Sequence, residues 1–282
     1  MPNLPSAAPH LTWTMEPAVI AAAAVATVLF VRAFAELRRR GRTDHAPWSR
    51  LVFFAGGIAA GVLPLVSPLD AIADRYLLCA HMLEHVLIGD AAPALLLLAL
   101  RGPLLYFLLP APVLAPVARL KPLKRLLGVV LRPWVSVLLW AIAYGAWHIP
   151  AAYDYTLTHG TVHDTEHACF FAGGLLIWTQ LIDPDRRGRL TVAGRLTLAA
   201  VVFGLGTLLS DVLVFSLHPL YASYAAQPDR LLGLSPLEDQ RLAGLVMIAE
   251  QLVSLGTCFF VLLRPSLRRA HQPAGRIRER TA

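Results

Sequence analysis

Seven long apolar stretches constrain the fold of this chain more than any other feature. A helix needs about 20 apolar residues to cross the hydrocarbon core of a bilayer, which is roughly 30 Å thick. The stretches lie at about 17–37, 50–67, 76–100, 132–149, 162–182, 196–217 and 240–264. A mean hydropathy of +0.58 and a charged fraction of 15% also indicate burial in lipid. Since no strand-like alternation accompanies them, the sequence predicts an all-α, polytopic membrane helix bundle of about seven transmembrane helices.

The predicted bundle covers residues 17–267 and leaves no loop long enough for a soluble domain. Residues 1–16 are predicted to form an external N-terminal segment, and residues 268–282 a basic cytoplasmic tail. The stretch 102–120 is apolar but short, and four prolines interrupt it. We therefore expect this stretch to form a short interfacial segment rather than a further span.

The basic residues predict how the bundle is oriented. If the seven spans alternate in direction, every Lys and Arg except Arg75, Arg230 and Arg241 lies on one side of the membrane. By the positive-inside rule this side is cytoplasmic, so the N-terminus is predicted outside and the C-terminus inside. The net charge of +7 is therefore interpreted as a topology signal, and no nucleic-acid partner is expected.

Two matching histidine motifs lie in the third and fifth predicted spans. They read HMLEH at 81–85 and HDTEH at 163–167, so each has two histidines one helical turn apart and a glutamate before the second. Residues three and four positions apart share a helix face, and each motif therefore presents a His-Glu-His face. Both faces are predicted in the outer half of the membrane. Ionisable side chains are costly against lipid at this depth, so the two faces are expected to turn inward.

Two such faces are typical of a metal site, because neutral imidazole is a common ligand of zinc, copper and iron. The predicted ligands come in pairs from two helices: His81, His85, His163 and His167. Glu84 and Glu166 are expected to support them as ligands, as acceptors that orient the imidazoles, or as compensating charge. His148 closes the fourth span on the same side and is predicted to gate or extend the site.

Several alternatives stay open at this point. The pattern HxxEH also occurs in a class of zinc proteases, so a seven-helix zinc hydrolase acting on lipid or peptide is one. Any of these histidines could instead make a satisfied polar contact between helices. A b-type haem is disfavoured, because two histidines one turn apart would crowd a single ring. Ligand type and spacing do not choose between copper and zinc.

Other acidic residues also lie in or beside the spans. Asp211 and Glu250 fall inside the sixth and seventh spans, where metal binding, a proton path and structural pairing between helices are all open. Asp90 is predicted to lie too deep to reach the histidines. Asp70 and Asp74 are expected to be solvated residues at the outer rim.

Four motifs follow one another between about residues 50 and 264: HMLEHVLIGDAAPALLLLA, WHIPAAYDYTL, HDTEHACFFAGGLLIW and DQRLAGLVM. Together they resemble the CtaG family of polytopic cytochrome c oxidase assembly proteins. The resemblance implies a multi-pass protein of the bacterial cell membrane that is needed to form active oxidase. It further implies handling of copper for the oxidase metal centres, with oxidase subunits or other assembly factors as partners. An assembly or metal-handling factor is thus expected rather than an enzyme.

The resemblance also carries individual positions over to this chain. The family's motif histidines correspond to His81, His85, His148, His163 and His167. Asp154, Asp239 and Gln240 match further motif positions, and at the outer rim we expect them to make interhelical contacts or to dock a partner. The chain departs from the family in having Glu84 where Gln is common and Ile248 where Trp is common. An added carboxylate can change the preferred metal, so copper is expected with zinc as the alternative.

Overall fold

The structure is a computed structural model that describes residues 13–229 and 231–270. These residues form helices joined by turns, without a strand. The predicted all-α fold is therefore confirmed. Most of the predicted external segment and of the predicted basic tail lies outside the described residues, namely 1–12 and 271–282.

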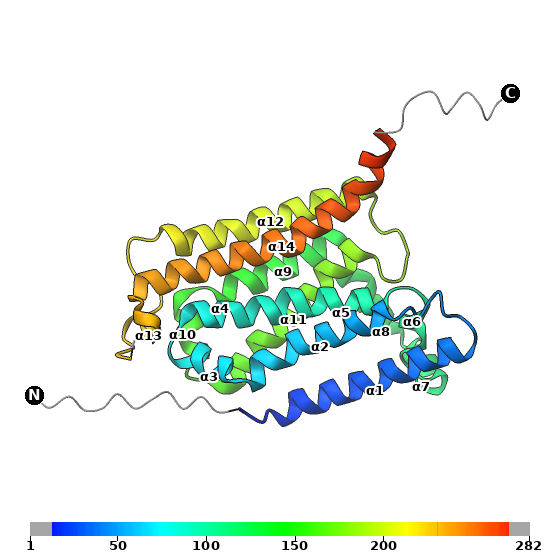
Figure 1. Ribbon diagram of the computed structural model, residues 1–282, viewed down its shortest axis with the longest axis horizontal. Helices are drawn as coiled ribbons and strands as arrows, with labels where there is room; N and C mark the ends of the chain where they lie inside the picture. Colours follow the sequence, from blue (N-terminus) through cyan, green and yellow to red (C-terminus); the bar gives the residue numbers. More distant parts are fainter. Residues whose placement is uncertain (1–12, 230, 271–282) are drawn as a thin grey trace, which may run out of the picture.

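Every predicted span coincides with a long helix or a continuous set of helices. The helices run side by side along one axis (Figure 1), and they are α1 (Pro17–Arg39), α2 (Ser49–Val66), α4 (Leu78–Val86) with η1 (Leu87–Ala91) and α5 (Ala92–Leu100), α9 (Pro133–Trp147), α11 (Gly160–Ile182), α12 (Val192–Phe215) and α14 (Pro236–Ala270). The element η1 is a π-helical turn that joins α4 to α5 without a break.

Short helices connect the long ones at both ends of the bundle (Figure 1). One end holds α3 (Pro68–Arg75), α10 (Pro150–Thr156), α13 (Ala222–Ala225) and the 3-10 turn η2 (Leu231–Gly233), and we call it the histidine end. The other holds α6 (Pro103–Phe107), α7 (Ala111–Val117) and α8 (Lys121–Val130), and we call it the basic end. Pro103 begins α6 and Pro112 lies in the first turn of α7, where the fixed backbone angle of proline suits a helix start, while Pro116 lies inside α7.

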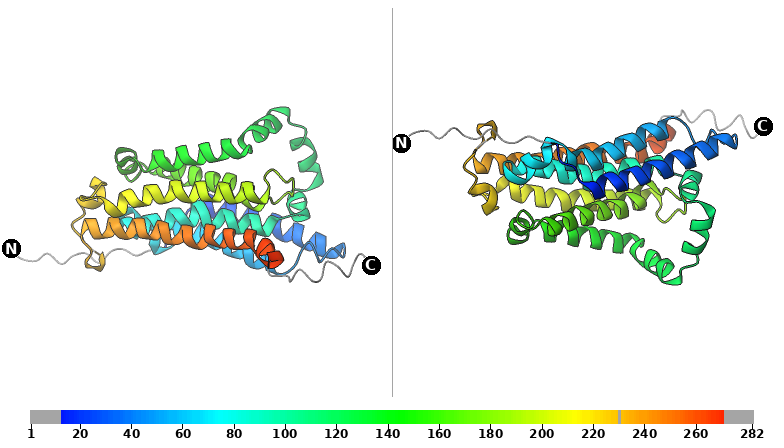
Figure 2. Two further views of the ribbon diagram at one scale, coloured as in Figure 1. Left: turned by 90° about the horizontal axis from the view of Figure 1, so that it is seen from above. Right: turned by 90° about the horizontal axis from the view of Figure 1, so that it is seen from below.

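Five helical segments are long and apolar enough to cross a membrane: α1, α2, α4 through α5, α12 and α14. The pair α8 and α9 would make a sixth if it forms one span, although it bends by 79° (Figure 2). Helix α11 has 23 residues but begins with the polar sequence of the second histidine motif, which lowers its hydropathy. The total of seven spans and the orientation of the termini therefore stay predictions.

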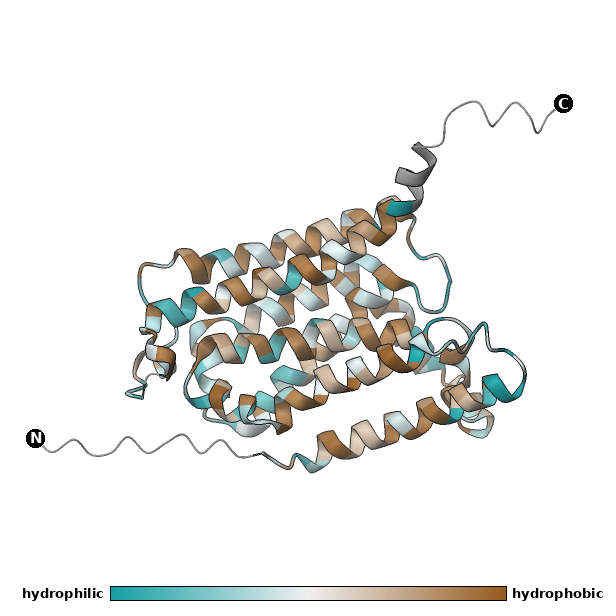
Figure 3. Cartoon of the chain, viewed as in Figure 1, coloured by the Kyte–Doolittle hydropathy of each residue, from teal (hydrophilic) through white to brown (hydrophobic). Residues whose placement is uncertain are grey.

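The polar and apolar residues are distributed as a bilayer requires. In Figure 3 hydrophobic residues run along the long helices, while many of the most hydrophilic residues lie towards the two ends. Large apolar side chains such as Val28, Val52, Leu208, Val253 and Phe260 are exposed on the outside of the bundle. In a membrane these side chains contact lipid, so their exposure needs no partner protein.

One close helix crossing brings the two histidine motifs together. Helix α11 packs against α9, α5 and η1. It passes so near to η1 that only a glycine can be accommodated at position 174 of α11. A Cβ added at Gly174 would lie 1.9 Å from the carbonyl oxygen of Gly89 and 2.8 Å from Cγ of Pro93. Small residues of this kind let helix backbones approach closely in membranes. The crossing lies about two turns from His167 on α11 and one turn from His85 on the facing segment.

Candidate metal centre

The four predicted ligand histidines meet inside the bundle at the histidine end. One ring nitrogen of each lies within 4.8 Å of those of the other three: His81 and His85 of α4, and His163 and His167 of α11. All four side chains are buried. Nε2 of His81 is 2.8 Å from Nε2 of His85 and 3.3 Å from Nε2 of His163. The two helices thus converge as the motif spacing predicts, and we call these four residues the histidine cluster.

The spacing of the ring nitrogens suits a single transition-metal ion. Zinc–nitrogen bonds are about 2.0–2.1 Å long, so two nitrogens of a tetrahedral site are separated by roughly 3.3 Å. The distance of 3.3 Å between the Nε2 atoms of His81 and His163 equals this value. The widest pair, within 4.8 Å, needs to close by about 1.5 Å at most. The pair at 2.8 Å, Nε2 of His81 and Nε2 of His85, would open by about 0.5 Å.

A tyrosine sets the tautomer of His81. The hydroxyl group of Tyr224 donates a hydrogen bond to the carbonyl oxygen of Ala73, which can only accept. Its oxygen lies 2.8 Å from Nδ1 of His81, so Nδ1–H is the donor in that contact. The proton of the neutral ring is then on Nδ1, and Nε2 presents a lone pair to the cluster. A fixed tautomer of this kind prepares an imidazole for metal binding.

We expect Tyr224→Phe to weaken metal binding by about 10- to 100-fold, because groups that orient a ligating histidine have effects of this size. The phenyl ring keeps the packing of the buried tyrosine but offers no oxygen to Nδ1 of His81. The dissociation constant of the purified protein, measured by competition with a chelator, checks the prediction. Tyr155→Phe is a suitable control, because Tyr155 is exposed at the same end. Equal affinity in both variants would contradict the assigned role.

Two buried glutamates flank the histidine cluster. Glu84 and Glu166 are both fully buried, and none of their carboxylate oxygens has a hydrogen-bond partner among the described residues. Oε1 of Glu84 lies 3.8 Å from Nε2 of His167, and Oε1 of Glu166 lies 3.9 Å from Nε2 of His85. Each glutamate therefore approaches the second histidine of the other helix. Unpaired buried carboxylates are costly, and a bound cation is one way to offset that cost.

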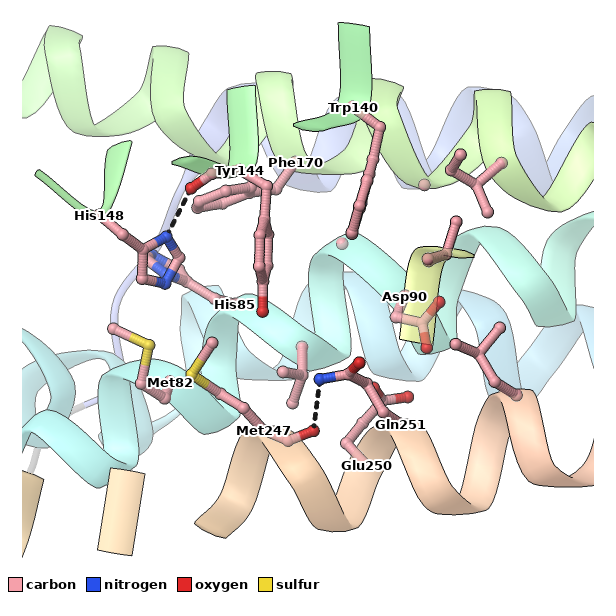
Figure 4. A pocket seen from close by; sticks show the side chains of 16 residues that line it. Met82, His85, Asp90, Trp140, Tyr144, His148, Phe170, Met247, Glu250 and Gln251 are labelled. Carbon is pink, nitrogen blue, oxygen red and sulfur yellow. Dashed lines mark hydrogen bonds between the residues drawn. The ribbon is translucent and has the colours of Figure 1, made fainter. Parts of the chain in front are cut away.

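His148 lies beside the histidine cluster but is not one of its four members. Its Nδ1 donates a 2.8 Å hydrogen bond to the carbonyl oxygen of Tyr144, as Figure 4 shows. Its Nε2 is buried and has no partner among the described residues. The ring centroid is 6.4 Å from that of His85. The position agrees with a gating or extending residue, and that role stays a prediction.

Asp74 is closer to the histidines than the sequence indicates. Its Oδ1 lies 3.8 Å from Nε2 of His163 and 3.9 Å from Nδ1 of His81, and this oxygen is buried without a hydrogen-bond partner. Burial raises the pKa of Asp74 to about 6. Asp74 lies at the rim and is partly accessible as predicted, but one of its oxygens is buried against the histidines because the short helix α3 packs over the start of α4. No motif spacing signals this contact.

Asp239 holds the start of α4 in place. Its buried carboxylate accepts hydrogen bonds from the backbone N–H groups of Leu78 at 2.7 Å and Cys79 at 3.0 Å. These are the first residues of α4, whose N–H groups have no partner within the helix. The acceptor comes from α14, so it also fixes α14 against the helix that carries His81.

Replacing this carboxylate should lower stability. We expect Asp239→Ala to reduce the free energy of unfolding by about 2 kcal/mol, because two helix-terminal N–H groups lose a charged acceptor. Thermal unfolding in detergent measures the change. Asp164→Ala removes an exposed carboxylate of α11 and serves as control. A melting temperature of the Asp239 variant equal to that of the control would be inconsistent with the capping role.

The other two rim residues also connect helices. Oε1 of Gln240 accepts from the backbone N–H of Leu220 at 2.6 Å, and its Nε2 donates to the carbonyl oxygen of Leu213 at 3.1 Å. The carboxylate of Asp154 accepts from the backbone N–H groups of Ala222 and Ser223 at the start of α13. The expectation of interhelical contacts is therefore confirmed for Asp154, Asp239 and Gln240.

Comparison with known proteins adds one match. The model of the family described as cytochrome c oxidase caa3 assembly factor (Caa3_CtaG) matches residues 28–269. This range includes the histidine cluster, both buried glutamates and the rim residues. Comparisons with curated proteins and with solved structures gave no match.

Proposed function

Because the chain belongs to the family of cytochrome c oxidase caa3 assembly factors, we propose that it supports oxidase assembly in the bacterial cell membrane by binding a metal ion at the histidine cluster. One observation carries this proposal. Four imidazole nitrogens from two helices lie within 4.8 Å of one another inside an apolar bundle, beside two carboxylates without hydrogen-bond partners. Buried polar groups in native proteins are nearly always satisfied, whereas His85, His167 and both glutamates here have buried atoms without a partner among the described residues, and a bound ion would offset that cost.

The charge of the site favours a divalent ion. The four imidazoles are neutral when they bind a metal, while Glu84 and Glu166 carry two negative charges when ionised. A divalent cation makes this buried group neutral, and a monovalent cation leaves it negative. Among divalent ions, copper binds nitrogen ligands more tightly than zinc does. We therefore propose Cu²⁺ as the bound ion, with Zn²⁺ as the alternative.

The metal is cargo in this proposal, so it needs a route in and out. The most exposed groups at the histidine cluster are Asp74, with 34% of its side chain accessible, and His163, with 11%. His81 and Glu84 are fully buried behind them. We propose that the ion enters and leaves on the side of α3, at the end of the bundle that is predicted to face outward. An oxidase subunit or another assembly factor would then receive the ion there.

A zinc hydrolase fits this arrangement less well. Catalytic zinc sites have three protein ligands and keep a position open for water or substrate. Here four imidazoles from two helices already lie within 4.8 Å of one another, each glutamate lies beside one of them, and all six side chains are buried. The cavity that adjoins His85 has a volume of about 60 Å³, which is far smaller than a lipid or peptide substrate requires.

Metal analysis of the full-length protein tests the proposal. We expect about one copper ion per chain in protein purified from cells, and less assembled oxidase in cells that lack the protein. Glu84→Gln separates the two functions: it should weaken metal binding in an assembly factor, whereas in a hydrolase it should leave the metal bound and abolish turnover. Wild-type protein that restores the oxidase without binding copper or zinc would overturn the metal-binding proposal.

A further inference from the structure

Two cavities follow each other along the bundle and share one glutamate. The first, of about 60 Å³, is lined on α14 by Met247 through Leu255, and the second, of about 410 Å³, by Glu250 through Leu262. On α11 and on the segment from α4 to α5, the residues that line the second cavity also lie nearer the basic end than those that line the first. The first cavity adjoins His85 at the histidine end, and the second adjoins Arg101 near the basic end.

A pair of carboxyl groups lies where the two cavities meet. Asp90 comes from the π-helical turn η1 and Glu250 from the middle of α14, and the two side chains are close enough to interact. The indole N–H of Trp178 donates a hydrogen bond to Asp90. Among the described residues no Lys or Arg forms an ion pair with either carboxyl group. Two negative charges at close range inside a membrane would repel each other strongly, so two neighbouring carboxyl groups without a cation are unusual here.

The first cavity is lined by two residues with unsatisfied polar atoms. His148 and Gln251 both line it, and Nε2 of His148 and Oε1 of Gln251 have no hydrogen-bond partner among the described residues. Both side chains are more than nine-tenths buried, and Oε1 of Gln251 lies against Gly206 of α12. A volume of about 60 Å³ holds a few water molecules, since each needs roughly 10–15 Å³. Figure 4 shows His148 and the carboxyl pair at opposite ends of this cavity, with Tyr144 between them.

The second cavity lies towards the basic end and is lined mainly by apolar side chains, among them Val253 on the outside of the bundle. Its polar groups come from Glu250, from Ser254 and from the guanidinium-bearing residues Arg101 and Arg195. The titratable groups that face the carboxyl pair are therefore His85, His148 and Tyr144 from one cavity and Cys258 and the two arginines from the other. Neither arginine forms an ion pair with the two carboxyl groups, and Arg195 pairs with Asp183 at 3.0 Å.

We propose that Asp90 and Glu250 form a proton-transfer site that carries protons between the two cavities. A proton passes from a water molecule in one cavity to the carboxyl pair, and the pair releases a proton to a water molecule in the other cavity. No other bond forms or breaks. Intramembrane carboxyl groups that face water-filled cavities are typical of proton pathways. The π-helical turn supports a specialised role for Asp90, because such turns occur often at functional sites.

This activity goes beyond the proposed function and does not depend on it. Neither carboxyl group is a member of the histidine cluster and no metal takes part in the proposed proton transfer, although His85 of the cluster lines the first cavity. The activity can be tested directly with full-length protein in liposomes. A potassium gradient with valinomycin imposes a membrane potential, and a pH-sensitive dye inside the liposomes reports proton uptake. We expect proton uptake well above that of empty liposomes. Glu250→Gln and Asp90→Asn should each slow it by at least about tenfold.

Two control variants distinguish a role of the carboxyl pair in proton transfer from a role in helix packing. Asp211→Asn removes an intramembrane carboxyl group that lines neither cavity, so proton uptake should stay at the wild-type rate. Glu250→Asp keeps a carboxyl group and should retain much more uptake than Glu250→Gln. The proposal would be overturned if liposomes with wild-type protein took up protons no faster than empty liposomes. It would also be overturned if Glu250→Gln and wild type took up protons at equal rates. Equal loss in Glu250→Asp and Glu250→Gln would assign these residues to packing alone and overturn it as well.

Discussion

We expect the double substitution His85→Ala with His167→Ala to abolish stoichiometric metal binding. Each change removes one imidazole of the histidine cluster from one helix, and two neighbouring histidines remain. Four-ligand structural zinc sites bind with about 10–16 kcal/mol, or roughly 3 kcal/mol per ligand. Loss of two ligands should therefore raise the dissociation constant by about 10⁴-fold, since 1.36 kcal/mol is tenfold. Chelator competition with purified protein measures this constant, and oxidase activity in cells should fall with it.

A matched control uses histidines at the same end of the bundle. His159 and His218 are both exposed and outside the cluster, so His159→Ala with His218→Ala makes the same chemical change without removing a proposed ligand. The control should bind metal as the wild type does and should support normal oxidase levels. Full metal binding by the His85 and His167 variant would show that the ion binds elsewhere. If this variant no longer bound metal but oxidase levels in cells stayed normal, the histidine cluster would not be needed for oxidase assembly.

The main features of the site could be predicted from the sequence because they depend on helix geometry alone. Residues 81, 84 and 85 share a face in any helix, and so do residues 163, 166 and 167. A lipid environment leaves the bundle interior as the favourable direction for both faces. Apolar length defines the spans, and for that reason the long helices coincide with the predicted stretches.

Other features depend on contacts between distant segments, and no local pattern signals them. Tyr224 lies 143 residues from His81, yet its hydroxyl group fixes the tautomer of that histidine. Asp74 reaches His163 because α3 folds over the end of the bundle. The π-helical turn that carries Asp90 inserts an extra residue into an apolar helix, and helix propensity does not distinguish it from an α-helical turn.

The crossing of α11 and η1 connects the fold to the histidine cluster. Without it, the two His-Glu-His faces would lie on separate helices with no fixed distance between them. A backbone contact at Gly174 sets how near α11 comes to η1, and α4 continues directly into η1. The ring nitrogens of the two motifs meet about two to three turns away along α11, at His167 and His163. A small change in this contact should therefore be transmitted to the metal site, because packed helices move as rigid bodies.

We expect Gly174→Ala to be strongly destabilising and to weaken metal binding. The added methyl group would lie 1.9 Å from the carbonyl oxygen of Gly89, and a backbone atom of this kind cannot rotate away. Overpacking at buried sites costs about 1–3 kcal/mol and occasionally more, and a backbone clash belongs at the upper end of this range. A loss of roughly 3 kcal/mol in the free energy of unfolding is expected, with a melting temperature in detergent lower by several degrees.

Glycines without neighbours provide the control for this substitution. A Cβ at Gly145 of α9 or Gly204 of α12 would meet nothing within 4 Å, so alanine there should be neutral or should stabilise its helix by up to about 1 kcal/mol. Both control variants should bind metal as the wild type does. For Gly174→Ala, metal affinity measured well below the melting temperature should still be reduced, because separation of α11 from η1 draws His163 and His167 away from α4. Wild-type stability of this variant would mean that α11 crosses η1 at a greater distance, and the histidine cluster would lose its geometric basis.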